Sequence, residues 1–116
     1  MSEQEIQETI QNHLARNKEL KQLLVSKGVD LEVKRTIDLH FWAFGEVAAR
    51  NLEVALETAG YSVSVAKPSE KDSSFWNVES QVSTSPLEVT TSFFIERLAR
   101  LAAENQAEFD GWGTSF

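Results

Sequence analysis

The sequence contains no cysteine, which excludes disulfide bonds, thiolate nucleophiles and cysteine-ligated zinc or iron–sulfur sites. Its five glycines are isolated or near the C-terminus, so there is no glycine-rich phosphate-binding loop. There is also no GxSxG nucleophile elbow and no HExxH zinc motif. Enzymatic activity therefore has no positive support, and we expect no catalytic residues, no cofactor and no metal site.

Long hydrophobic runs are absent as well. No uncharged apolar stretch approaches the roughly 20 residues that a membrane-spanning helix requires. The N-terminal segment lacks the basic start and the apolar run of a signal peptide. We therefore expect a cytoplasmic protein without a membrane segment.

Positive charge is in the minority. Eleven Lys and Arg residues face 18 Asp and Glu residues, which gives a formal net charge of −7. This charge repels nucleic-acid phosphates and anionic lipids, so the sequence predicts no direct nucleic-acid or membrane partner. The acidic residues are spread along the chain, and this distribution also suits solubility alone.

The 116 residues, of which 41% are hydrophobic, are enough for one domain with one core. We divide the chain into an N-terminal amphipathic helix, residues 1–30, and a single domain, residues 31–116. The helix itself is expected over residues 3–26, with a narrow apolar stripe and with His13 on its polar, solvated part. The stripe consists of Ile6, Ile10, Leu14, Leu20 and Leu24.

The remaining periodicities alternate between strand and helix. Alternation with period two predicts strands, and spacing near 3.6 predicts helices. Ser85 and Pro86 suit the start of the last helix as N-cap and first residue. The expected strands are 35–44, 61–67, 75–83 and 108–116, and the expected helices are 46–59 and 86–105. The order β-α-β-β-α-β predicts an α+β, ferredoxin-like fold: a four-stranded antiparallel sheet with two helices on one face, plus the extra N-terminal helix.

In this architecture one face of the sheet has no helix of the domain over it. Its central strands present mixed aromatic and polar side chains, which are Thr36, Asp38, His40, Trp42, Phe75, Asn77, Glu79 and Gln81. Aromatic anchors with polar neighbours are typical of a binding surface. The alternative is a solvated face that the N-terminal helix partly covers. RNA binding is disfavoured, since the RNP signature is missing and carboxylates stand where phosphates need cations.

His40 invites a second interpretation, because Asp38 and Glu79 are expected on the same face. The three side chains could form a metal site or an acid–base pair. Two carboxylates and one imidazole are a thin ligand set, and no helical His pair supports them. We therefore expect His40 to have a structural or partner-facing role.

The chain ends in Phe109-Asp110-Gly111-Trp112-Gly113-Thr114-Ser115-Phe116. The two glycines permit a tight turn or a bulge, and Trp112 could pin the strand down or contact a partner. This ending resembles the aromatic-DGWGT ending of the RraB family, the regulators of ribonuclease E activity. The segments FWAF, AGYSV and FWNVES, and the last helix, match the family's layout over residues 36–116.

The resemblance implies a ferredoxin-like, non-catalytic regulator whose partner is a protein, ribonuclease E. The chain departs from the founding members in two respects, because it lacks their acidic C-terminal extension and has its own amphipathic N-terminal helix. The candidate contact residues are Asp38, His40, Trp42, Glu79, Asp110, Gly111 and Trp112. The alternative function is a self-associating adaptor, with a homodimer interface on the N-terminal helix or on the uncovered sheet face.

Overall fold

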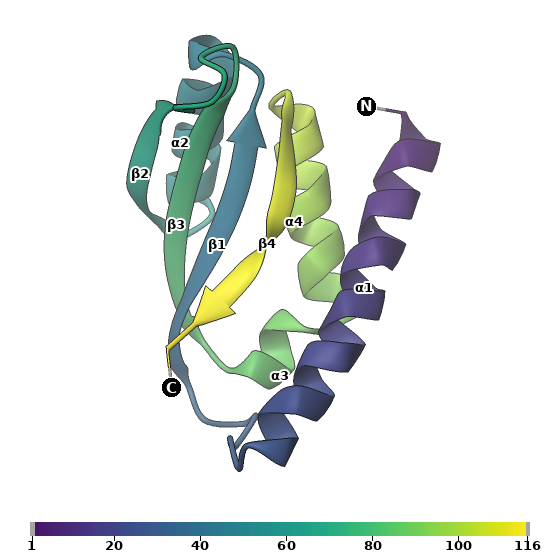
Figure 1. The fold of residues 1–116 in the computed structure, drawn as a ribbon. Helices are drawn as coiled ribbons and strands as arrows, with labels where there is room; N and C mark the ends of the chain where they lie inside the picture. The colour runs from purple at the N-terminus through teal and green to yellow at the C-terminus, as the bar shows by residue number, and fades with distance from the viewer. Residues whose placement is uncertain (1, 116) are drawn as a thin grey trace.

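A computed structural model describes residues 2–115 and confirms the predicted fold class. Four strands form one antiparallel sheet in the order β2-β3-β1-β4, and α2 and α4 cover one of its faces (Figure 1). This is the ferredoxin-like strand order, with both crossover helices on the same side. The elements are α1 Glu3–Ser26, β1 Arg35–Ala43, α2 Glu46–Thr58, β2 Ser62–Pro68, β3 Trp76–Thr84, α3 Pro86–Val89, α4 Ser92–Glu104 and β4 Ala107–Thr114.

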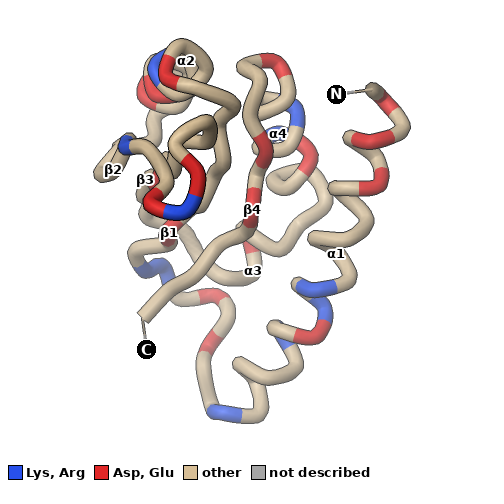
Figure 2. The backbone as a smooth tube through the Cα atoms, turned by 45° about the horizontal axis from the view of Figure 1, so that its top comes forward, with Lys and Arg blue, Asp and Glu red and all other residues tan. Residues whose placement is uncertain are grey.

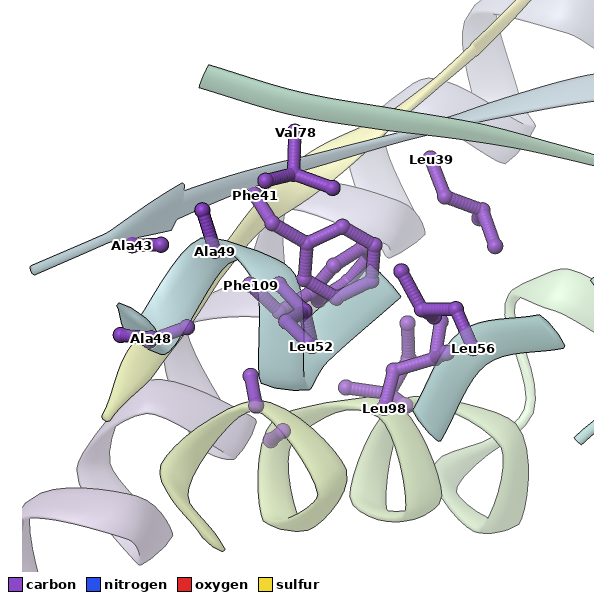
Figure 3. Close-up of a cluster of buried hydrophobic side chains, with 14 of the residues drawn as sticks. Leu39, Phe41, Ala43, Ala48, Ala49, Leu52, Leu56, Val78, Leu98 and Phe109 are labelled. Carbon is purple, nitrogen blue, oxygen red and sulfur yellow. The ribbon is translucent and has the colours of Figure 1, made fainter. Parts of the chain in front are cut away.

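The core lies between the sheet and these two helices (Figure 3). Alternate residues of β1 point into it, and Leu39 and Phe41 are almost completely buried. Leu52 of α2 and Leu98 of α4 meet them from the helix layer. Because a strand alternates its faces, the same register turns the polar residues of β1 away from the core.

α1 lies beside α4 and the edge strand β4, not over the uncovered sheet face (Figure 1). A capping box between Ser2 and Glu5 begins the helix. Ile6 and Ile10 then join the main core cluster. Among residues 2–115, no helix has the length and apolar character needed to cross a membrane.

The single helix expected over residues 86–105 is wrong, because the chain forms two helices there. α3 ends at Val89, and Thr91 adopts an extended conformation as the N-cap of α4. The Thr91 hydroxyl accepts a hydrogen bond from the Phe94 amide and donates one to the Glu88 carbonyl. Threonine competes in this way for backbone groups that would otherwise continue the helix. The predicted N-cap role of Ser85 is confirmed, since its hydroxyl accepts from the Glu88 amide.

The regular alternation expected along β2 is also wrong. The register against β3 shifts between Val63 and Val65, so that Val65 pairs with Glu79 and Ala66 pairs with Val78. Ala66 therefore packs against the core, and Val65 takes the opposite face. A local irregularity of this kind reverses the faces of every later residue in the strand.

Candidate functional site

The sheet face opposite α2 and α4 carries no helix among the described residues, and we call it the open face (Figure 1). Its side chains follow from the strand register. They include Thr36, Asp38, His40 and Trp42 of β1, Ser62, Val65 and Lys67 of β2, Asn77, Glu79 and Gln81 of β3, and Glu108 of β4, with Ser64 and Asp110 beside them.

Polar contacts connect three strands across this face. His40 Nδ1 lies 3.2 Å from Glu79 Oε1, and both side chains are 41% exposed. Gln81 Nε2 donates to Asp38 Oδ1 at 3.2 Å and to Ser64 Oγ at 2.8 Å. Polar contacts between such exposed side chains contribute little to stability, so these residues can exchange their contacts for those of a partner.

β4 contributes a bulge at the predicted Asp-Gly. His40 pairs with Gly111 and Phe41 pairs with Phe109, so Asp110 has no ladder partner. Gly111 has φ 132°, a conformation that favours glycine. Asp110 is exposed and lines one depression together with His40, Trp42 and Glu79. The structure thus brings four of the seven predicted contact residues together, with Gly111 beside them and Asp38 two residues along β1.

Trp112 does not line this depression; it lines another one with His40, Asp110 and Gly111, against His13, Arg16, Asn17 and Leu20 of α1. It pairs with Leu39, whose side chain points into the core, and it packs against the core cluster. Its indole Nε1 donates to Asn17 Oδ1 of α1 at 2.9 Å. Trp112 therefore pins the edge strand to α1, which is one of the two roles expected for it.

The expectation that His13 is solvated is wrong. His13 is only 3% exposed, and its Nε2 lies 2.8 Å from the Phe109 carbonyl oxygen. Its Nδ1 lies 3.0 Å from Arg16 Nη2. Arginine can only donate, so Nδ1 accepts and Nε2 carries the hydrogen that the Phe109 carbonyl receives. Burial lowers the pKa of this imidazole below 6.5, although the Phe109 carbonyl acts in the opposite direction.

The sequence did contain a signal for this contact. Residues 6, 10, 13, 17, 20 and 24 are spaced alternately four and three apart, which is one continuous helical seam. Four of these positions are apolar, and the seam is complete only when His13 and Asn17 are counted as buried. A search limited to apolar residues leaves a gap in the middle of α1 and misses them.

A second depression lies at one end of the open face, and we call it the aromatic hollow. It has a volume of about 310 Å³ and is lined by Trp42, Phe44, Ser69, Lys71, Asp72, Phe75 and Glu108. Phe44 follows β1 and is 51% exposed. The centroid of its ring lies 5.5 Å from that of the Phe75 ring. Phe75 lies immediately before β3, whereas the sequence placed it inside the strand.

Negative charge dominates the open face. Asp38, Glu79, Glu108 and Asp110 contribute carboxylates, whereas Lys67 at the β2 edge and Lys71 in the aromatic hollow are basic. Figure 2 shows the acidic positions of β4, and the mixed charges of the loop between β2 and β3. No group of three or more His, Asp or Glu side chains within residues 2–115 is arranged to hold a metal ion.

Comparison with known proteins identifies the family to which the chain belongs. No curated protein matches the sequence. The family model described as RraB, Regulator of ribonuclease activity B, matches residues 14–114, which include the second half of α1, the whole sheet and the DGWGT ending. This span covers nearly the whole chain, and the chain therefore belongs to the RraB family, whose members regulate ribonuclease activity.

Proposed function

We propose that this protein is a non-catalytic, cytoplasmic regulator that binds a ribonuclease of the ribonuclease E type through its open face. Membership of a family that regulates ribonuclease activity supports a protein partner. The proposal includes no cofactor, no metal and no direct contact with the RNA. The net charge of −7 favours protein over nucleic acid as the binding partner.

The observation that carries the proposal is the exposed, mixed surface around His40. An indole, an imidazole and two carboxylates line one depression on a sheet face that no described helix covers. Aromatic side chains with polar neighbours are typical of the energetically important part of protein interfaces. The contact surface that we propose comprises Asp38, His40, Trp42, Glu79 and Asp110, with Gly111 and Trp112 fixing the strand that presents Asp110.

The direct test combines binding with catalysis. The purified full chain is immobilised and presented with the ribonuclease E of the same host, and RNA cleavage by that nuclease is then measured with and without the free chain. We expect retention of the nuclease at low ionic strength and slower cleavage. Loss of both effects in Trp42→Ala, with an unchanged fold, would place the contact on the open face. Absence of retention at low salt would refute the partner.

The alternative, a self-associating adaptor, is favoured by exposed apolar residues at the end of α1. Leu23 is 49% exposed and Val25 is 59% exposed. Apolar side chains at such exposure are common on monomers when they are scattered singly, so an interface would require them to act together. Light scattering at high protein concentration separates the two functions, because a monomer excludes the homodimer.

A further inference from the structure

The aromatic hollow has apolar walls from three rings. Trp42 is the last outward residue of β1, Phe44 follows the strand, and Phe75 precedes the adjacent strand β3. The Phe44 and Phe75 rings meet edge to face, at 5.5 Å and 66°. Phe44 remains 51% exposed, so the chain leaves much of this aromatic surface out of its own packing.

Carboxylates stand beside these rings. Glu108 pairs with Trp42 across β1 and β4, and Asp72 lies in the loop between β2 and β3. Asp72 Oδ1 accepts hydrogen bonds from the Ser74 hydroxyl and from the Ser74 amide. These bonds lower the pKa of Asp72, so its carboxylate stays ionised near neutral pH.

Backbone hydrogen bonds fix the segments that form the aromatic hollow. The Phe44 amide donates to the Gln106 carbonyl at 3.1 Å, which fixes one wall. The Ser69 amide donates to the Phe75 carbonyl at 2.8 Å, and the Phe75 amide donates to the Asp72 carbonyl at 3.1 Å, which fixes the other wall and the rim. A preformed site does not lose ordering entropy when it binds, so a small group bound there keeps more of its contact energy.

Aromatic faces attract cations through their negative quadrupole, and neighbouring carboxylates add direct charge attraction. A planar guanidinium can stack on an indole and still donate to a carboxylate, which an ammonium does less well. We propose that the aromatic hollow binds an arginine side chain of a basic protein segment that lies along the open face. This inference rests on the proposed function, according to which the partner is a protein. It adds that the partner presents an arginine side chain to the hollow.

The side chain of Lys71 also lines the hollow, and it offers a direct test of the charge that the hollow binds. Its charge opposes an incoming guanidinium, so Lys71→Gln should strengthen binding. If Lys71 instead attracted an acidic group of the partner, Lys71→Gln would weaken binding of the partner. That result would overturn the proposal.

The first experiment requires no nuclease. The ¹⁵N-labelled full chain is titrated with the peptide acetyl-(Arg-Gly)₃-amide and with a matched peptide in which citrulline replaces arginine. Citrulline keeps the shape of arginine and removes its charge. The chain has three indole N–H groups, in Trp42, Trp76 and Trp112, which report on separate places. We expect the arginine peptide to shift the Trp42 signal and to leave that of Trp112, hydrogen-bonded to Asn17, in place.

Three variants then test the site. Trp42→Leu and Glu108→Gln should each weaken binding of the arginine peptide roughly three- to tenfold, as expected for a partly exposed cation–π or charge contact. Glu57→Gln removes the same charge from an exposed position on α2 and should leave the affinity unchanged. Equal binding of the citrulline peptide, or equal effects of Glu108→Gln and Glu57→Gln, would overturn the proposal. Amide spectra of each variant verify the fold independently.

The outcomes separate this inference from the proposed function. If the nuclease binds the chain but Trp42→Leu and Glu108→Gln leave that binding unchanged, the arginine site is wrong and the regulator survives. If the arginine peptide binds in the hollow but the nuclease is not retained, the site is correct and its natural partner is another basic protein. Concentration-dependent self-association that occupies the hollow and excludes the peptide would overturn the arginine site.

Discussion

Asn17 of α1 and Trp112 of β4 are joined by a hydrogen bond of 2.9 Å across 95 residues of chain. One turn earlier on α1, His13 donates to the Phe109 carbonyl. These two contacts attach α1 to the edge strand of the sheet. Trp112 of the DGWGT ending therefore has a structural contact, while Asp110 in the same ending stays exposed beside the open face.

Trp112→Phe should destabilise the protein because it removes the indole donor and leaves buried Asn17 Oδ1 without a partner. Asn17 is 5% exposed, and its Nδ2 already has no hydrogen-bond partner among residues 2–115. We expect a loss of about 1–3 kcal/mol in the free energy of unfolding, measured by urea denaturation. Trp42→Phe on the open face is the matched control and should cost less. Equal losses would show that the bond to Asn17 contributes nothing.

The buried imidazole of His13 predicts that stability depends on pH. Burial lowers its pKa in the folded state, so the unfolded chain, with a pKa near 6.5, binds the proton more readily. The stabilising contribution is therefore complete above pH 6.5 and is lost as pH falls through the lower folded pKa. Denaturation curves measured from pH 7.5 down to pH 5 should show this decline.

The nearby charges modify the same titration. Arg16 on α1 adds to the lowering of the His13 pKa, and Asp110 on β4 opposes it. His13→Gln should flatten the pH dependence in this interval. A decline that persists unchanged in His13→Gln would assign it to other groups.

The strands could be predicted from sequence because each one has a buried and an exposed face. The alternation of Ile37, Leu39 and Phe41 with polar residues is local, and it survives any tertiary arrangement that buries one side. The helix cap at Ser85 is equally local, since one hydroxyl and one amide three residues later define it. The four-stranded order then followed from two short crossovers.

The position of α1 and the bulge in β2 were not accessible to the same reasoning. The four-and-three spacing on α1 marks positions 13 and 17 as part of a buried seam, but it does not identify their hydrogen-bond partners about 95 residues away. A bulge shifts every later side chain by one face, yet the only local sign of the one in β4 is Gly111. The single helix expected over residues 86–105 overlooked Thr91, which is the N-cap of α4.

The two glycines of the DGWGT ending should respond differently to substitution. Gly111 has φ 132°, where a side chain strains the backbone, so Gly111→Ala should cost about 1–3 kcal/mol. At Gly113 an added Cβ would lie 3.9 Å from His40 Nε2, an ordinary contact, and Gly113→Ala should change stability by less than about 0.5 kcal/mol. Thermal unfolding of both variants checks the difference. A mild Gly111→Ala would mean that the bulge relaxes without strain.

Binding to the nuclease should weaken when the carboxylates of the open face are neutralised. Glu79→Gln and Asp110→Asn each remove one negative charge from the depression around His40, and exposed charges act chiefly on the association rate and on its salt dependence. We therefore expect slower association in surface plasmon resonance, and a smaller decrease of that rate between low and physiological salt. Glu57→Gln changes the net charge equally from the far side of the helix layer, so it separates local from overall charge. If all three variants slow association alike, the net charge of the chain, and not the open face, attracts the partner.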